Sequence, residues 1–250
     1  MGKKYCLIIP SVVLCFAGDA FAVTNKLIEK PKPIGWSLDL GGQYTWMSFT
    51  TPPTYSGDTG GVFGKITYQK PKSFYGQLRS VYNIGTLNQV AASSRDSEWY
   101  SEFVGGYCFS IASNWLFTPY IGVGCDFLKD SKAAYSSYSP IDLKYQTNYG
   151  IFGIETHYAW SRFSLGVQAE ALTVFNQYLS ITGLTGSSWK MTRRAGFDVH
   201  LPIGYRVVKN IWFEVSPYYR FLPIGSSSVL ALSDRDLTQA GITIAFRFFQ

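Results

Sequence analysis

The sequence of 250 residues has few charged residues and, after residue 22, no long apolar run. Asp, Glu, Lys and Arg make up 15% of the chain, whereas aromatic residues make up 17%. A spanning helix needs about 18 consecutive apolar residues, and no stretch beyond residue 22 supplies them. The net charge of +6 is spread thinly, without a basic stripe interleaved with stacking aromatics. The sequence therefore indicates no nucleic-acid partner.

Cysteine and histidine are too scarce to indicate a metal site or a disulfide framework. The chain contains four cysteines and two histidines, and neither Cys108 nor Cys125 has a Cys-x-x-Cys neighbour. Strand alternation places Cys108 on an inner face and Cys125 on an outer face, where their side chains diverge. We expect two free thiols, no metal and no cofactor.

The first 22 residues have the pattern of a cleaved export signal. Lys3 and Lys4 precede an apolar stretch from Tyr5 to Phe16, and Ala20-Phe21-Ala22 is a small-x-small cleavage pattern. We therefore divide the chain into a signal peptide at 1–22, a short N-terminal segment at 23–33 and one domain at 34–250.

Apolar and polar residues alternate in segments throughout the predicted domain. In the first segment Trp36, Leu38 and Leu40 share one face, while Asp39 and Gln43 share the other. This period of two indicates strands with one apolar and one polar face, and the alternation of short and long connections is typical of an up-and-down barrel. We predict ten strands near residues 34–49, 61–70, 73–87, 98–111, 116–129, 145–158, 162–175, 190–207, 211–223 and 237–249.

The final segment, Thr238 to Gln250, alternates up to an aromatic end, and the apolar faces are aromatic near the strand ends. In these features the chain resembles the small monomeric β-barrel proteins of the bacterial outer membrane. The resemblance implies an all-β, antiparallel, transmembrane barrel in the cell outer membrane, in contact with outer-membrane lipid and lipopolysaccharide. It also implies that the barrel assembly machinery recognises the last strand. Members usually end on an aromatic residue, whereas this chain ends on Gln250.

The polar faces of the predicted strands place charges of both signs inside the barrel. An isolated ion in such an interior is costly, so these charges should pair and fill the lumen. The predicted charge network consists of Arg79, Glu102, Asp126, Glu170, Arg194, Asp198 and Arg220.

Counting outward from the short turns predicts which residues face each other. Asp198 should oppose Arg220 as an ion pair, and Pro202 should oppose Ser216 at a point of weakened pairing or a bulge. The same counting places Glu98 opposite Asp130 and Glu102 opposite Asp126. Two such like-charge pairs require that Arg79 reaches them, that a cation binds there, or that the register slips by two residues.

The segment Asp198-Val199-His200 is similar to the Asp-x-His pair of omptin proteases, which are also ten-stranded. This resemblance implies that His200 activates water, that Asp198 orients the imidazole, and that Asp96 or Glu98 supplies the partner acid. His200 lies much nearer its periplasmic turn than Asp96 lies to its own, so we expect no shared cleft.

These observations favour a non-enzymatic barrel that anchors exposed loops for surface interaction or envelope structure. The loops Lys132 to Lys144 and Asn176 to Lys190 are the predicted contact surfaces for a ligand of unknown identity. The alternatives are a small channel for ions or solutes and, second, an omptin-like surface protease.

Overall fold

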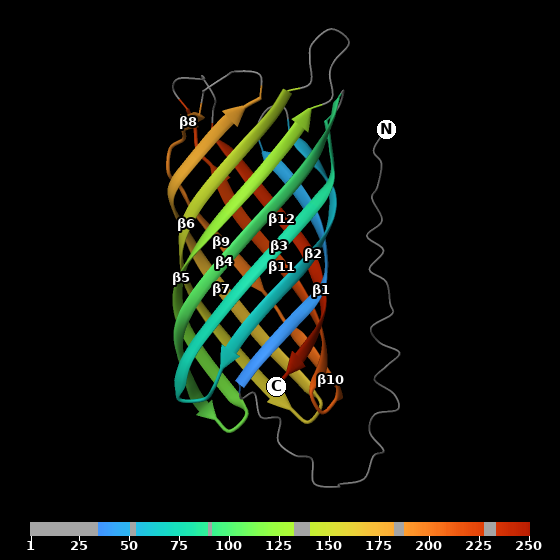
Figure 1. The fold of residues 1–250 in the computed structure, drawn as a ribbon, viewed down its shortest axis with the longest axis vertical. Helices are drawn as coiled ribbons and strands as arrows, with labels where there is room; N and C mark the ends of the chain where they lie inside the picture. The colour runs from blue at the N-terminus through green and yellow to red at the C-terminus, as the bar shows by residue number, and fades with distance from the viewer. Residues whose placement is uncertain (1–34, 51–53, 90–91, 133–140, 183–187, 228–233) are drawn as a thin grey trace, which may run out of the picture. The chain divides into compact units, whose positions relative to one another are not determined.

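The computed structural model describes residues 35–50, 54–89, 92–132, 141–182, 188–227 and 234–250 (Figure 1). The predicted signal peptide at 1–22 and the segment at 23–33 lie outside these ranges, as do residues 133–140 and 183–187 of the two predicted contact loops. Within the described ranges no helix is long and apolar enough to cross a membrane.

The described residues form one antiparallel sheet that closes on itself. Strands β10, β11, β12 and β1 to β8 are neighbours in that order, while β9 and β10 bridge β7 to β11. The backbone N–H of Gln250 also donates to the Trp36 carbonyl at 3.1 Å, which joins the last strand to the first. The strands are β1 (Gly35–Thr50), β2 (Tyr55–Gln69), β3 (Ser73–Gln89), β4 (Ala92–Ala112), β5 (Trp115–Lys132), β6 (Ile141–Trp160), β7 (Phe163–Ile181), β8 (Ser188–Lys190), β9 (Ala195–His200), β10 (Ile203–Val208), β11 (Ile211–Ile224) and β12 (Arg235–Phe249).

Ten strand positions surround the barrel, as predicted, but the eighth is divided among β8, β9 and β10. The short turns gather at one end, called the turn end below, near β10 in Figure 1. The opposite end, near β8, is called the loop end. The closed all-β, antiparallel barrel confirms the predicted fold class.

The two faces of the sheet differ in the way that lipid contact requires. Outward apolar side chains are open to the surroundings, with Val62 and Ile121 each 64% exposed, whereas inward Asp39 and Asp198 are fully buried. Soluble monomers rarely expose a continuous apolar surface of this extent. Outward aromatics lie near both ends, for example Trp115 towards the turn end and Phe127 towards the loop end. The barrel is therefore polar inside and apolar outside, with aromatic girdles.

Several strands extend farther towards the loop end than predicted. β4 begins at Ala92 instead of residue 98, and β6 begins at Ile141 instead of 145. Residues 176–181, assigned to a loop, belong to β7. Beyond the apolar belt the outward positions need not be apolar, so alternation of hydropathy no longer marks the strand.

The predicted register between β4 and β5 is wrong by two residues. Glu98 faces Leu128 and Glu102 faces Gly124, instead of Asp130 and Asp126. The turn is the tight pair at residues 113–114, and the ladder is irregular between Ser110 and Ala112. The slip by two residues was one of the three explanations left open. It removes Glu98 and Glu102 from their predicted acidic partners and places Asp96 opposite Asp130 instead.

Pro202 interrupts the eighth strand position without shifting its register. β9 ends at His200, which faces Tyr218, and β10 begins at Ile203, which faces Val215. The Pro202 carbonyl still accepts from the Gly166 N–H at 2.8 Å, but proline has no N–H to donate. The predicted weakening of pairing is confirmed as a break between two strands, with no bulge at the proline.

Candidate functional site

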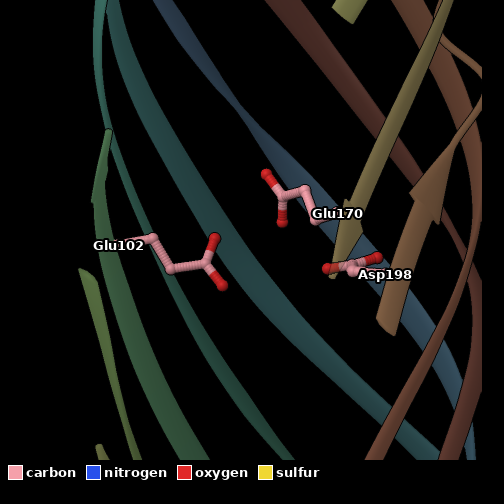
Figure 2. A group of neighbouring side chains, drawn as sticks. All are labelled: Glu102, Glu170 and Asp198. Atoms are coloured by element: carbon pink, nitrogen blue, oxygen red, sulfur yellow. The ribbon is translucent and has the colours of Figure 1, made fainter. Parts of the chain in front are cut away.

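The barrel interior is the candidate site, because its central layer brings together charged groups from distant strands. Arg79 on β3 donates through Nε to Glu102 on β4 at 2.7 Å, and its Nη2 also contacts Glu102. The same guanidinium contacts Asp198 on β9 at 3.2 Å and Glu170 on β7 at 3.4 Å. Figure 2 shows the three carboxylates facing one another across the interior. Strand alternation aims each of these side chains inward.

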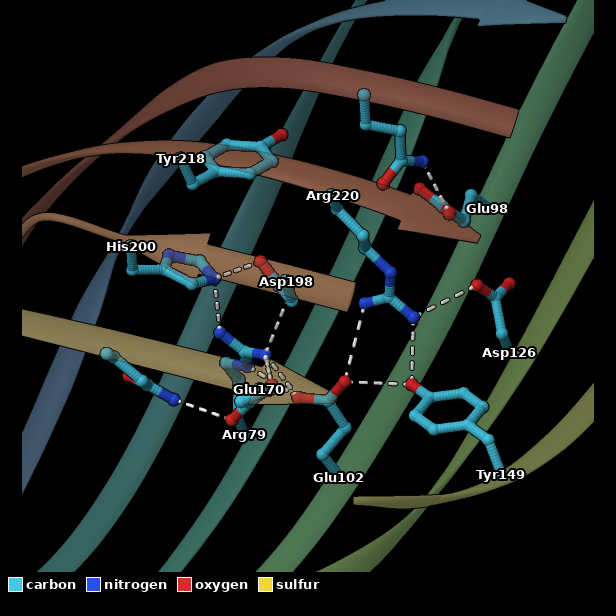
Figure 3. Close-up of polar contacts among 12 residues, drawn as sticks. Arg79, Glu98, Glu102, Asp126, Tyr149, Glu170, Asp198, His200, Tyr218 and Arg220 are labelled. Atoms are coloured by element: carbon cyan, nitrogen blue, oxygen red, sulfur yellow. Dashed lines mark hydrogen bonds and ion pairs between the residues drawn. The ribbon is translucent and has the colours of Figure 1, made fainter. Parts of the chain in front are cut away.

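A second arginine, Arg220 on β11, joins this layer to the neighbouring wall (Figure 3). Its Nη1 lies 3.4 Å from Glu102, and its Nη2 lies 3.4 Å from Asp126 and 2.8 Å from the Tyr149 hydroxyl. The Tyr149 hydroxyl in turn donates to Glu102 at 2.8 Å. The guanidinium also lies 4.1 Å above the centre of the Tyr100 ring. Glu102 therefore couples the two arginines, and the network links β3, β4, β5, β6, β7, β9 and β11.

A separate ion cluster lies nearer the turn end. Arg247 on β12 forms two parallel hydrogen bonds of 2.8 Å with Asp39 on β1. Lys65 on β2 contacts Asp39 at 2.9 Å, and Arg247 also contacts Glu214 on β11 at 2.7 Å. Two cations and two carboxylates balance in this cluster, which closes the sheet where the last strand meets the first.

An apolar layer fills the interior near the loop end. Its buried members come from strands around the barrel, together with Met191 from the segment between β8 and β9, and they pack against one another, which excludes water at this level. These residues are Met47, Phe49, Leu87, Leu128, Tyr145, Leu179, Met191, Ile224 and Leu237.

Little free volume remains among the polar side chains of the lumen. Two small cavities, of about 20 and 30 Å³, lie between the central network and the turn end. A cavity of roughly 10–15 Å³ is enough for one water molecule, so each of these has room for only one or two. At this level the described side chains leave space for no more than isolated water molecules.

The structure brings together six of the seven residues predicted for the charge network and excludes Arg194. That side chain is 35% exposed and pairs with Asp236 at 2.8 Å. The prediction assumed one strand through 190–207, whereas residues 191–194 are not in a strand. Alternation counted back from Asp198 therefore does not extend to Arg194.

The predicted register of Asp198 opposite Arg220 is present, but the predicted ion pair takes another form. Arg220 forms its ion pairs with Glu102 and Asp126, while Asp198 pairs with Arg79. Long arginine side chains reach across the bore, so the nearest residue in the ladder is not the partner.

The protease candidates do not form one cleft. His200 is buried, stacks on Tyr218 at 5.3 Å, and its Nε2 lies 2.7 Å from an Arg79 nitrogen and 3.0 Å from Asp198. The Glu98 carboxylate does not contact His200. It accepts hydrogen bonds from the side-chain amides of Gln239 and Asn83. Asp96 faces Asp130, six residues along β4 from Glu102 towards the loop end. The groups required for water activation are therefore at different heights.

The sequence reasoning missed the tyrosines that complete the central network. Tyr149 binds both Arg220 and Glu102, and Tyr120 donates to Glu170 at 2.8 Å. Each tyrosine faces a glycine on the neighbouring strand: Tyr149 faces Gly124, and Tyr120 faces Gly153. A Cβ at either glycine would collide with the tyrosine ring. An inward tyrosine opposite glycine is the sequence signal that could have found them.

The three carboxylates of Figure 2 offer oxygens within 4.8 Å of one another, as a metal site would. Arg79 contacts all three, however, and its guanidinium supplies the positive charge at this position. Among the residues that the structure describes, Cys108 and Cys125 are free thiols, as expected, with Cys108 buried inside.

No family model matches the sequence, and no curated protein matches it. The fold is similar to that of the outer membrane protease OmpT from Escherichia coli, with 11% identity, a TM-score of 0.57, and coverage of 90% of this chain and 99% of that chain. The translocator domain of the autotransporter NalP from Neisseria meningitidis has 5% identity, a TM-score of 0.49, and coverage of 86% and 88%.

The closed barrel, its lipid-facing belt and the likeness of fold define an outer-membrane β-barrel. The chain is a multi-pass β-barrel protein of the outer membrane. The predicted class and location are confirmed, and the likeness to a protease extends to the fold alone.

Proposed function

We propose that this protein is a non-conducting, non-enzymatic barrel that holds its outer loops on a rigid support for surface interaction. The observation that carries this proposal is the filled lumen. An apolar layer, the arginine network and the Asp39 cluster occupy successive heights of the bore. Loops on a rigid scaffold are where recognition residues usually lie.

The ion pairs support a fixed interior and not a passage. Arg79 and Arg220 together contact four carboxylates, and both guanidiniums are almost fully buried. Opening a path would separate buried ion pairs, which costs about 3–5 kcal/mol for each broken partner. A hydrated ion also has no room in cavities of about 20 and 30 Å³.

Planar-bilayer recording tests the proposal directly. The folded chain should add no steady current to the membrane, whereas an open porin reconstituted in the same way should give unitary steps. Reproducible unitary conductance of this chain, with ion selectivity altered in Arg79→Met, would instead establish the channel alternative.

The proposed absence of enzymatic activity has its own test. The His200 imidazole is buried among Arg79, Asp198 and Tyr218, so a peptide on the outer surface has no path to it. Intact cells or proteoliposomes carrying the protein should leave a broad peptide library uncut. Cleavage that disappears in His200→Ala would overturn this part of the proposal.

A further inference from the structure

The outer face of the barrel carries a groove close to the loop end, lined by residues of β3 to β8. Its volume is about 640 Å³. Most of its lining belongs to two successive rows of outward side chains, and each row runs across the strands in ladder register. Glu98, Leu128 and Tyr145, whose side chains are buried, also border it. The sheet thus presents the two rows as adjacent bands, one above the other.

The lower row is mainly aromatic. Trp99 and Phe127 face each other on β4 and β5 and stack with ring centres 5.3 Å apart. Aromatic side chains of this kind mark the level where lipid meets water. The row comprises Tyr82, Trp99, Phe127, Gln146, Tyr178 and Lys190.

The upper row places two lysines directly opposite each other. Lys129 on β5 faces Lys144 on β6, an arrangement that is unfavourable unless negative charge lies nearby. Asp142 contacts Lys129 at 2.8 Å, and the described residues offer Lys144 no ion pair of its own. One carboxylate therefore serves two ammonium groups. The row comprises Ser97, Lys129, Lys144, Ser180 and Ser188.

Further cations lie beside this groove, where Asp142 is the exposed carboxylate and Glu98 borders the groove with its side chain buried inside the barrel. Exposed Arg95 is one row above, opposite Ser131, and exposed Lys190 ends the lower row. At the same end of the barrel the outward positions on β2 and β12 include Asp58 and Asp236. Among the described outward residues of β4 to β8 near this end, Arg95, Lys129, Lys144 and Lys190 outnumber the one carboxylate, Asp142.

We propose that this groove binds the phosphorylated headgroup of a lipopolysaccharide molecule in the outer leaflet. The phosphate lies between Lys129 and Lys144 and relieves their repulsion, while Ser97 and Ser180 offer hydroxyl groups to the phosphate or sugar. The acyl chains descend over Trp99 and Phe127. This site depends on the location of the barrel in the outer membrane and is independent of whether the lumen conducts.

The test measures binding of deep-rough lipopolysaccharide by the folded chain in detergent micelles. Lys129→Gln/Lys144→Gln should lower the affinity at least tenfold. Asp142→Asn removes the competing carboxylate and should raise the affinity severalfold. The matched control, Lys70→Gln/Lys72→Gln, removes two exposed lysines at the turn end and should leave binding within twofold of the parent chain. Heat-dependent gel mobility checks that each variant is folded.

Binding of two further lipids distinguishes a specific phosphate site from general attraction to anionic lipid. Lipopolysaccharide with its lipid A phosphates removed should bind the parent chain as weakly as the double variant binds the intact molecule. Phosphatidylglycerol should bind at least tenfold more weakly. Equal binding of either lipid, or unchanged affinity in the lysine double variant, would overturn the proposed site.

Discussion

Arginines inside the barrel and lysines on its outer groove face opposite physical situations. Arg220 is 1% exposed and contacts two carboxylates, a tyrosine hydroxyl and an aromatic ring, whereas the Lys129 side chain is 45% exposed with one carboxylate. Removing a partner from a buried charge lowers stability by about 3–5 kcal/mol, whereas an exposed ion pair contributes at most about 1 kcal/mol. The difference indicates that the inner charges set stability and leaves the outer ones available for a ligand.

The largest expected effect comes from removing a central arginine. Arg220→Met should lower the free energy of unfolding by about 3–5 kcal/mol, because it leaves Glu102 and Asp126 buried with fewer partners. Urea unfolding in lipid vesicles, followed by tryptophan fluorescence, measures the loss. A change below about 1 kcal/mol would contradict the structural role of the network.

A smaller loss is expected in the cluster near the turn end. Asp39→Asn should cost about 1–3 kcal/mol, because it removes charge-assisted hydrogen bonds to Arg247 and the ion pair to Lys65. The side chains of both cations are 12–15% exposed, so water partly replaces the lost partner. The same unfolding assay should rank this variant between Arg220→Met and the parent chain. A cost equal to that of Arg220→Met would remove the distinction between the two clusters.

The packing of tyrosine over glycine gives a comparison that does not involve charge removal. A Cβ at Gly124 would collide with the Tyr149 ring, whereas one at Gly60 would meet nothing within 4 Å. Gly124→Ala should therefore destabilise the barrel by about 1–3 kcal/mol through overpacking. Gly60→Ala is the matched control and should change stability by less than about 0.5 kcal/mol. Equal effects of the two substitutions would show that the ring can move aside freely.

The smallest expected change in stability belongs to the outer groove. Lys129→Gln should alter the free energy of unfolding in phosphatidylcholine vesicles by less than about 0.5 kcal/mol, because its ion pair with Asp142 is exposed. If the loss instead approaches that of Arg220→Met, the lysine is a structural residue.

Much of the fold could be predicted from local chemistry. Trp36, Leu38 and Leu40 on one face with Asp39 and Gln43 on the other identify a strand with one apolar and one polar face, and the aromatic ends of the apolar faces indicate a membrane. The interior positions of Arg79, Glu102 and Asp198 follow from the same alternation. The strand limits at Ala92 and Ile141 could not be predicted from alternation, because outward residues beyond the lipid belt are not restricted to apolar types.

The partners within the site could not be predicted by counting. The ladder between β4 and β5 shifts by one residue between Ser110 and Ala112, and the observed partners of Glu98 and Glu102 differ by two residues from those counted from the turn. Pro202 divides a strand without shifting its register. Neither event can be distinguished in advance from a regular turn or a bulge. The assignment of Arg194 to the lumen failed for a related reason, since the strand is interrupted before β9.

By itself, the order of apolar and polar residues determined that this chain forms a closed barrel with charged side chains inside, because lipid and water select opposite faces of every strand. Only the tertiary structure decided which charges meet. Arg79 and Arg220 each reach partners on strands far apart in sequence, and those distances depend on the register and closure of the whole sheet. The juxtaposition of Lys129 and Lys144 likewise exists only once β5 and β6 are paired.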